Sequence, residues 1–171
     1  GLADKGRCTQ AQIRGLFPEE LTARQVADRH MAAAFQLNVY YTENAYKKNI
    51  QSNGGSGFFV SAGGLAVTNY HTIEDAVRAT VTLITGETFP VDRVLFADPD
   101  ADLALLRISK TSEDGKTEVP FFSFLEIAEE PALRRGDRIY TLGVPLGITP
   151  AISEGIVSAT DHMVSKFSAP C

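Results

Sequence analysis

The sequence predicts an all-β fold with minor helix, built around an antiparallel barrel. Six short runs rich in β-branched and aromatic residues follow one another between residues 35 and 109, and turn residues separate them. Short strands at such spacing, joined by hairpins, are typical of antiparallel barrels. The expected strands are Phe35–Tyr41, Gly57–Ser61, Leu65–Thr68, Ala79–Thr85, Thr88–Phe96 and Asp102–Ser109.

A helix is expected before the barrel, from Leu21 to Phe35. Thr22 and Gln25 have the spacing of a capping box, and an apolar stripe that contains His30 follows. We interpret His30 as a packing residue of this helix. Residues 1–34 form an N-terminal lead-in and helix, residues 35–109 the first barrel, and residues 42–53 a polar loop within it.

The strongest break in composition comes after the six strands, at KTSEDGKTE (residues 110–118). We therefore predict a linker over residues 110–135, with a helical turn near its end. Its phenylalanine cluster (Phe121, Phe122 and Phe124) is expected to pack between two barrels. Residues 136–171 then begin the second unit, with strands expected at Arg138–Leu142, Ile152–Ala159 and Met163–Ser168.

Composition excludes several classes of function. The chain has 171 residues, 44% of them hydrophobic, and a formal net charge of −5. This charge gives no basic surface for nucleic acid or anionic membrane, and no apolar run approaches the ~18 residues of a membrane span. The cysteines, Cys8 and Cys171, fit free thiols or one disulfide. The histidines, His30, His71 and His162, lie far apart, so we expect no metal and no cofactor.

Two motifs suggest chemistry together rather than singly. Gly63-Gly64 predicts a hairpin whose second strand ends just before His71, and Asp102 opens the apolar run LALL. Asp98 and Asp100 are better turn residues, because Asp-Pro-Asp favours a turn. Taken alone, His71 fits an exposed structural histidine and Asp102 a residue that caps a strand.

In order along the chain, GSGFFVSAGGLAVTNYHTIEDA, DPDADLALLRI and GDRIYTLGVPLGITPAISEGIVSA resemble trypsin-like serine peptidases of the HtrA type. The resemblance runs from about Leu21 onward and is strongest to exported bacterial members. It implies a trypsin-like antiparallel double β-barrel, incomplete in its second barrel here, and an exported or cell-envelope location. It also implies that His71 is the general base, that Asp102 is its orienting carboxylate and that the substrate is a polypeptide.

One departure from the family pattern concerns the nucleophile. The family's serine lies in a Gly-x-Ser-Gly-Gly stretch, and none of the serines of this sequence has that context. Ser56 has a glycine on each side but precedes the histidine hairpin. The final residues, 166–171, resemble the strand that precedes the nucleophile loop, and Cys171 falls too early to replace the serine. The chain is therefore expected to stop just short of its serine.

Two functions from different classes follow. The first is a serine endopeptidase, present here without its nucleophile and inactive by itself. The alternative is a non-catalytic binding module, a pseudo-peptidase that keeps the barrel. The few strands of the second barrel would leave open edges, which recruit other chains, so a homo-oligomer or a strand-swapped dimer is also expected.

Overall fold

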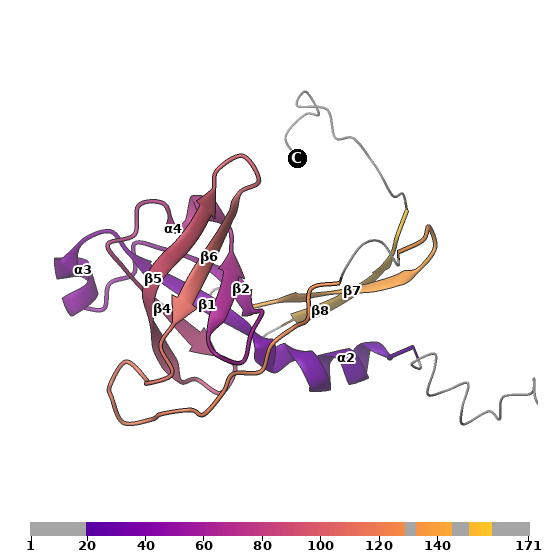
Figure 1. Ribbon diagram of the computed structural model, residues 1–171, viewed down its shortest axis with the longest axis horizontal. Coiled ribbons are helices and arrows are strands. Elements are labelled where there is room, and N and C mark those ends of the chain that lie inside the picture. The colour runs from indigo at the N-terminus through magenta and orange to yellow at the C-terminus, as the bar shows by residue number, and fades with distance from the viewer. Residues whose placement is uncertain (1–19, 129–132, 145–150, 159–171) are drawn as a thin grey trace, which may run out of the picture.

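The computed structural model describes residues 20–128, 133–144 and 151–158. A short helical segment precedes a six-stranded body, and a separate pair of strands follows it (Figure 1). The helical elements are α2 (Ala23–His30), the 3₁₀ helix η1 (Met31–Ala33), α3 (Glu43–Lys47) and α4 (Tyr70–Ile73). The strands are β1 (Ala34–Tyr40), β2 (Asn53–Phe59), β3 (Leu65–Thr68), β4 (Arg78–Leu83), β5 (Thr88–Asp98), β6 (Leu103–Ile108), β7 (Arg138–Gly143) and β8 (Ala151–Ile156).

The first six strands close into an antiparallel barrel in the order β1-β2-β3-β6-β5-β4. Strand β1 closes it, because Leu37 pairs with Gly55 of β2 on one side and with Val81 of β4 on the other. Since every strand has two neighbours, the barrel has no free edge. The prediction of a mostly β protein with minor helix, built around an antiparallel barrel, is thereby confirmed.

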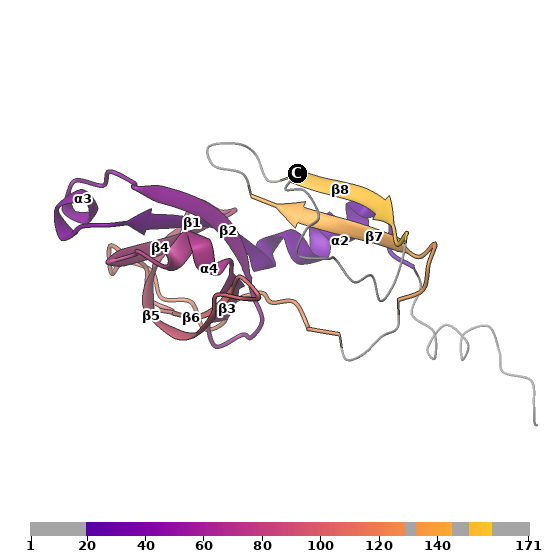
Figure 2. The same cartoon turned by 90° about the horizontal axis from the view of Figure 1, so that it is seen from above.

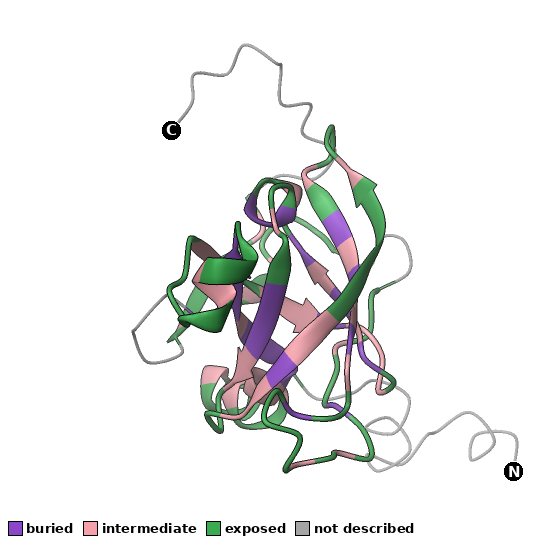
Figure 3. Ribbon diagram, turned by 90° about the vertical axis from the view of Figure 1, so that its left-hand side faces the viewer, coloured by how far each residue is buried: buried purple, intermediate pink, exposed green. Residues whose placement is uncertain are grey.

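Alternation along β1 explains how the barrel fills its interior. Phe35, Leu37 and Val39 are fully buried, and they meet buried residues of the other strands such as Phe89 and Leu106. Buried and more exposed stretches alternate along the strands in Figure 3. An apolar residue at every second position is what a barrel strand requires, since successive side chains point to opposite faces.

The hairpin predicted at Gly63-Gly64 is present between β2 and β3, although its turn differs from the expected one. Only Gly64 of the pair has a positive φ, of 105°, and the turn is longer than two residues. A Cβ on Gly64 would lie 2.4 Å from the carbonyl oxygen of Ile108. Gly64 is therefore required both by its backbone conformation and by the close approach of β6.

The prediction of a polar loop over residues 42–53 is correct only in part, because residues 48–52 are a loop but α3 precedes them and β2 follows. Thr42 is the N-cap of α3, and its Oγ1 accepts a hydrogen bond from the backbone N–H of Ala45 at 3.0 Å. Strand β2 begins at Asn53, well before the expected Gly57, because Gly54 and Gly55 pair with β1. A run of small and polar residues resembles a loop in sequence, but the partner strand supplies the hydrogen bonds that make it a strand.

Helix α2 is shorter than predicted at its C-terminal end. The capping box is confirmed, since Thr22 and Gln25 exchange backbone and side-chain hydrogen bonds. The helix ends at His30, however, and the chain is already in β1 at Ala34, which pairs with Phe58. Pairing with β2 therefore ends a helix that the apolar stripe alone would have continued to Phe35.

The phenylalanine cluster does not pack between two barrels as predicted. Phe122 is 3% exposed and lies in the core of the first barrel, stacked on Phe59 with ring centroids 4.2 Å apart and edge-on to Phe89 at 5.3 Å. Phe121 and Phe124 are 64% and 41% exposed. The segment that follows β6 thus closes the first barrel with one aromatic ring.

The described part of the expected helical turn, residues 127–128 and 133–135, is not helical.

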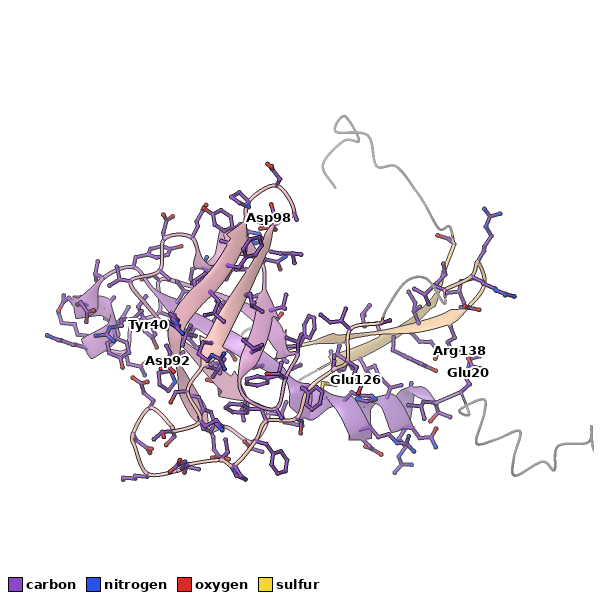
Figure 4. All side chains as sticks on the ribbon, viewed as in Figure 1. Glu20, Tyr40, Asp92, Asp98, Glu126 and Arg138 are labelled. Atoms are coloured by element: carbon purple, nitrogen blue, oxygen red, sulfur yellow. The ribbon has the colours of Figure 1, made fainter. Side chains whose placement is uncertain are left out.

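Strands β7 and β8 form a separate two-stranded antiparallel sheet. Helix α2 lies beside it (Figure 2), and the Tyr140 hydroxyl of β7 donates to the carbonyl oxygen of Leu21 at 3.0 Å. Arg138 Nε lies 3.0 Å from Oε1 of Glu154 in β8. The same arginine lies near Glu20, as Figure 4 shows. The third expected strand, Met163–Ser168, lies outside the described residues. Within the described ranges, no helix is long and apolar enough to cross a membrane.

Candidate active site

His71 is placed by a short helix at the end of a barrel strand. Strand β3 ends at Thr68, and α4 begins at Tyr70. Thr72 and Ile73 are buried and hold this turn against the barrel, whereas the His71 side chain is 68% exposed. The imidazole is therefore anchored by its neighbours in sequence and is open to solvent.

Asp102 is placed by the turn that joins β5 to β6. The Asp98 carboxylate, which lies near this end of the barrel in Figure 4, accepts from the backbone N–H groups of Asp100 and Ala101 at 3.0 and 3.1 Å. Asp102 itself has a φ of 54°, in the left-handed region. This conformation costs an L-residue about 1–2 kcal/mol, and aspartate tolerates it better than most residues. It places Asp102 just before β6 rather than inside it.

The two side chains meet through a two-point contact. His71 Nδ1 lies 2.6 Å from Asp102 Oδ2, and the His71 backbone N–H donates to Asp102 Oδ1 at 2.8 Å. Because an ionised carboxylate only accepts hydrogen bonds, Nδ1 carries a hydrogen, and in the neutral form of the ring Nε2 is then left with its lone pair. Both carboxylate oxygens are thus engaged by one residue, which fixes the position and the plane of the imidazole.

These hydrogen bonds also act on the acidity of Asp102. The backbone N–H of His71 is the largest cause that lowers the pKa of this carboxyl group, followed by the hydrogen bond from the His71 ring. Donors to a carboxylate stabilise its charged form, so Asp102 stays ionised to lower pH than an ordinary aspartate.

The strand expected at Asp102–Ser109 is β6, which begins at Leu103, so Asp102 lies just outside it. Its left-handed φ marks the turn before the strand. Its side chain is 41% exposed, so desolvation is not what demands a partner.

Sequence reasoning missed Asn69. Its side-chain Nδ2 donates to the backbone carbonyl oxygen of Asp102 at 3.2 Å, and the backbone N–H of Tyr70 donates to the same oxygen at 3.2 Å. The only signal in the sequence is that Asn69 lies two residues before the histidine. Nothing in the sequence indicates that its amide reaches another turn.

The other candidates lie elsewhere. His30 lines a cavity of about 530 Å³ bordered by α2, the barrel and β7. Ser56 lies in β2, and its carbonyl oxygen accepts from the Thr68 hydroxyl at 2.9 Å. Cys8, His162 and Cys171 are outside the described residues. Within the described residues, no three His, Cys, Asp or Glu side chains gather as a metal site.

Comparison with known proteins decides the family. The model of the trypsin-like peptidase domain matches residues 55–169 of this chain. The chain belongs to this family. A relative from Bartonella henselae, described as a probable periplasmic serine endoprotease DegP-like, supports the HtrA type. It is 30% identical to this chain over 142 residues, and the match covers 79% of this chain and 26% of that protein.

Two further relatives agree. The mitochondrial serine protease HTRA2 of Bos taurus is 33% identical over 123 residues, 72% of this chain and 25% of that protein. A probable periplasmic serine endoprotease DegP-like of Chlamydia pneumoniae is 34% identical over 105 residues, 61% of this chain and 20% of that protein. The trypsin-like peptidase chain described here thus spans about a quarter or less of the length of these curated relatives.

Proposed function

We propose that His71 and Asp102 are the general base and its orienting carboxylate in a serine endopeptidase of the HtrA type. The observation that supports this most directly is the two-point contact, in which one carboxylate binds both the ring Nδ1 and the backbone N–H of the same histidine. Such a contact holds the tautomer that leaves Nε2 free to take a proton from a nucleophile.

Each residue has a defined part in the proposed reaction. His71 Nε2 takes the hydroxyl proton as a serine attacks the peptide carbonyl, and the resulting imidazolium returns the proton to the leaving amine. Asp102 stabilises the imidazolium without itself taking the proton. An acyl-enzyme forms and water then hydrolyses it. We propose that the nucleophilic serine and most of the oxyanion hole are supplied by residues other than these 171.

The substrate class is polypeptide, and we propose an exported or cell-envelope location. The support for this location is that the similar bacterial proteins are described as periplasmic endoproteases, although a similar bovine protein is mitochondrial. The solvent-accessible imidazole fits a substrate that must approach from outside the barrel.

The proposal is tested with two proteins, the 171-residue chain and the full-length protein that carries it. We expect no measurable peptide hydrolysis by the chain alone, because none of its serines has the nucleophile context. In the full-length protein, His71→Ala should lower kcat by roughly 10⁶-fold and Asp102→Asn by roughly 10⁴-fold, as loss of the base and of its carboxylate do in known peptidases. Asp100→Asn removes a neighbouring charge from the same turn and serves as the control.

Two outcomes would contradict the proposal. Hydrolysis by the full-length protein that survives His71→Ala would assign the base to another residue. A full-length protein that binds polypeptides, yet hydrolyses none of them before or after the substitution, would favour the non-catalytic binding module instead.

A further inference from the structure

Asn69 occupies the cap position of a helix that it does not cap. It immediately precedes α4 and has the extended backbone of an N-cap residue, with φ −78° and ψ 137°. An asparagine at this position ordinarily accepts a hydrogen bond from a backbone N–H of the first turn. Its side chain makes no such bond to α4. The side chain reaches instead to Asp102, 33 residues away in the sequence, where Nδ2 donates to the carbonyl oxygen at 3.2 Å.

Asp102 is consequently held by three consecutive residues. Asn69 Nδ2 and the Tyr70 backbone N–H both donate to its carbonyl oxygen at 3.2 Å. The backbone N–H and the ring of His71 bind its two carboxylate oxygens. The peptide unit and the side chain of Asp102 are thus tied separately to the same short segment.

The hydrogen bonds to the Asp102 carbonyl oxygen matter because the backbone of this residue is left-handed. With φ at 54°, Asp102 is in a conformation that an L-residue leaves readily when nothing opposes the change. A change to an extended φ would rotate Cα and Cβ and would carry the carboxylate away from His71. Because the carbonyl oxygen belongs to the same residue, a donor that fixes it also limits where the carboxylate can lie.

We propose that Asn69 is a positioning residue, which gives up capping α4 in order to hold the Asp102 peptide unit so that the carboxylate meets His71 at two points. This inference rests on the proposed roles of His71 and Asp102. Asn69 acts through Asp102 and does not itself touch the substrate. Its loss should therefore lower kcat in the full-length protein by about tenfold, the value of one hydrogen bond, and should leave KM nearly unchanged.

The distinguishing variant is Asn69→Ser. Serine is as good an N-cap as asparagine, so α4 keeps a favourable start, but the serine side chain is too short to reach the Asp102 carbonyl oxygen. In the 171-residue chain, NMR follows the carboxyl titration of Asp102 and the Nδ1–H signal of His71. We expect Asn69→Ser to raise the pKa of Asp102 and to move the Nδ1–H signal upfield, because the contact with His71 loosens.

Thr68→Val is the matched control. Thr68 is the adjacent residue, and its hydroxyl also donates to a backbone oxygen, that of Ser56 at 2.9 Å. Among the described residues, however, it makes no hydrogen bond to Asp102. It should leave both signals in place, even though a hydrogen bond is lost. Asn69→Gln, which retains the donor on a longer side chain, should restore part of the wild-type signals.

The proposal is overturned if Asn69→Ser is folded and leaves the Asp102 titration and the Nδ1–H signal at their wild-type values. It is also overturned if Thr68→Val shifts both as much, since the effect would then be general loosening of this end of the barrel. These readouts need no hydrolysis. If His71→Ala leaves the full-length enzyme active, the proposed function fails, while the result for Asn69 stands as a statement about Asp102 geometry.

Discussion

Asp102 combines a left-handed backbone with a carboxylate that accepts two hydrogen bonds from His71. Its pKa is lowered from the ordinary value of 3.8 by these donors. A carboxyl group with a lower pKa in the folded than in the unfolded state stabilises the fold above its unfolded pKa. That contribution is lost as the pH falls through the folded pKa.

We therefore expect Asp102→Asn to reduce the free energy of unfolding at pH 7, and the difference from wild type to shrink below pH 3.8. Asparagine tolerates the left-handed region about as well as aspartate, so the substitution removes the charge without adding backbone strain. Urea unfolding of both proteins across this pH range measures the difference. If the two proteins differ in unfolding free energy as much in acid as at pH 7, the hydrogen bonds to the ionised carboxylate are not the cause of the difference.

Two of the residues at this site could be predicted from the sequence, and the rest could not. His71 and Asp102 lie in motifs that resemble those of HtrA-type peptidases, and this resemblance implies the proposed base and carboxylate. Asn69 and the left-handed φ of Asp102 depend on how two turns approach each other, and no local pattern in either turn carries that information.

At the scale of elements, alternation predicted the barrel strands well where the residues are apolar and β-branched. It failed at the start of β2, where Asn53, Gly54 and Gly55 carry no β signal and become a strand only by pairing with β1. It also missed α3, which is only five residues long. Helix α2 was recognised by its capping box, but its end is set by the pairing of Ala34 with Phe58.

Phe122 lies outside the six strands, yet its ring is part of the barrel core. Phe122→Ala should reduce the free energy of unfolding by about 3–5 kcal/mol, because it leaves a cavity against Phe59 and Phe89. Phe121→Ala, at the neighbouring and 64% exposed position, should change it by less than about 0.5 kcal/mol. Denaturant unfolding of the two variants measures both changes. Equal losses of unfolding free energy would mean that the Phe122 ring does not contribute to the core.

At the scale of the whole molecule, the barrel and the β7–β8 pair differ in how their edges are satisfied. The barrel closes on itself, whereas β7 and β8 pair only with each other among the described strands. Helix α2 lies against this pair, yet Ile156 of β8 remains 66% exposed. Unpaired edges beside exposed apolar side chains favour association with another chain.

We accordingly expect the 171-residue chain to associate in solution, as a homo-oligomer or a strand-swapped dimer. Light scattering over a dilution series measures this directly, and the mass should exceed that of one chain at high concentration. An introduced Ile156→Lys places a charge beside the β8 edge and should shift the equilibrium toward monomer. A monomer that persists at all concentrations, with ordinary solubility, would contradict the expectation.

The position of Phe122 in the sequence limits where gene recombination can cut this barrel without damaging its core. The barrel's hydrogen-bonded strands end at Ile108, but its interior is completed by a residue beyond them, and Leu125 is still tied to Phe59 through its backbone. A recombination event that joined foreign sequence directly after β6 would yield a protein with all six strands but without the Phe122 ring in its core. We therefore expect recombinants to keep a complete barrel only when the breakpoint lies after Leu125, so that the strands and Phe122 stay together.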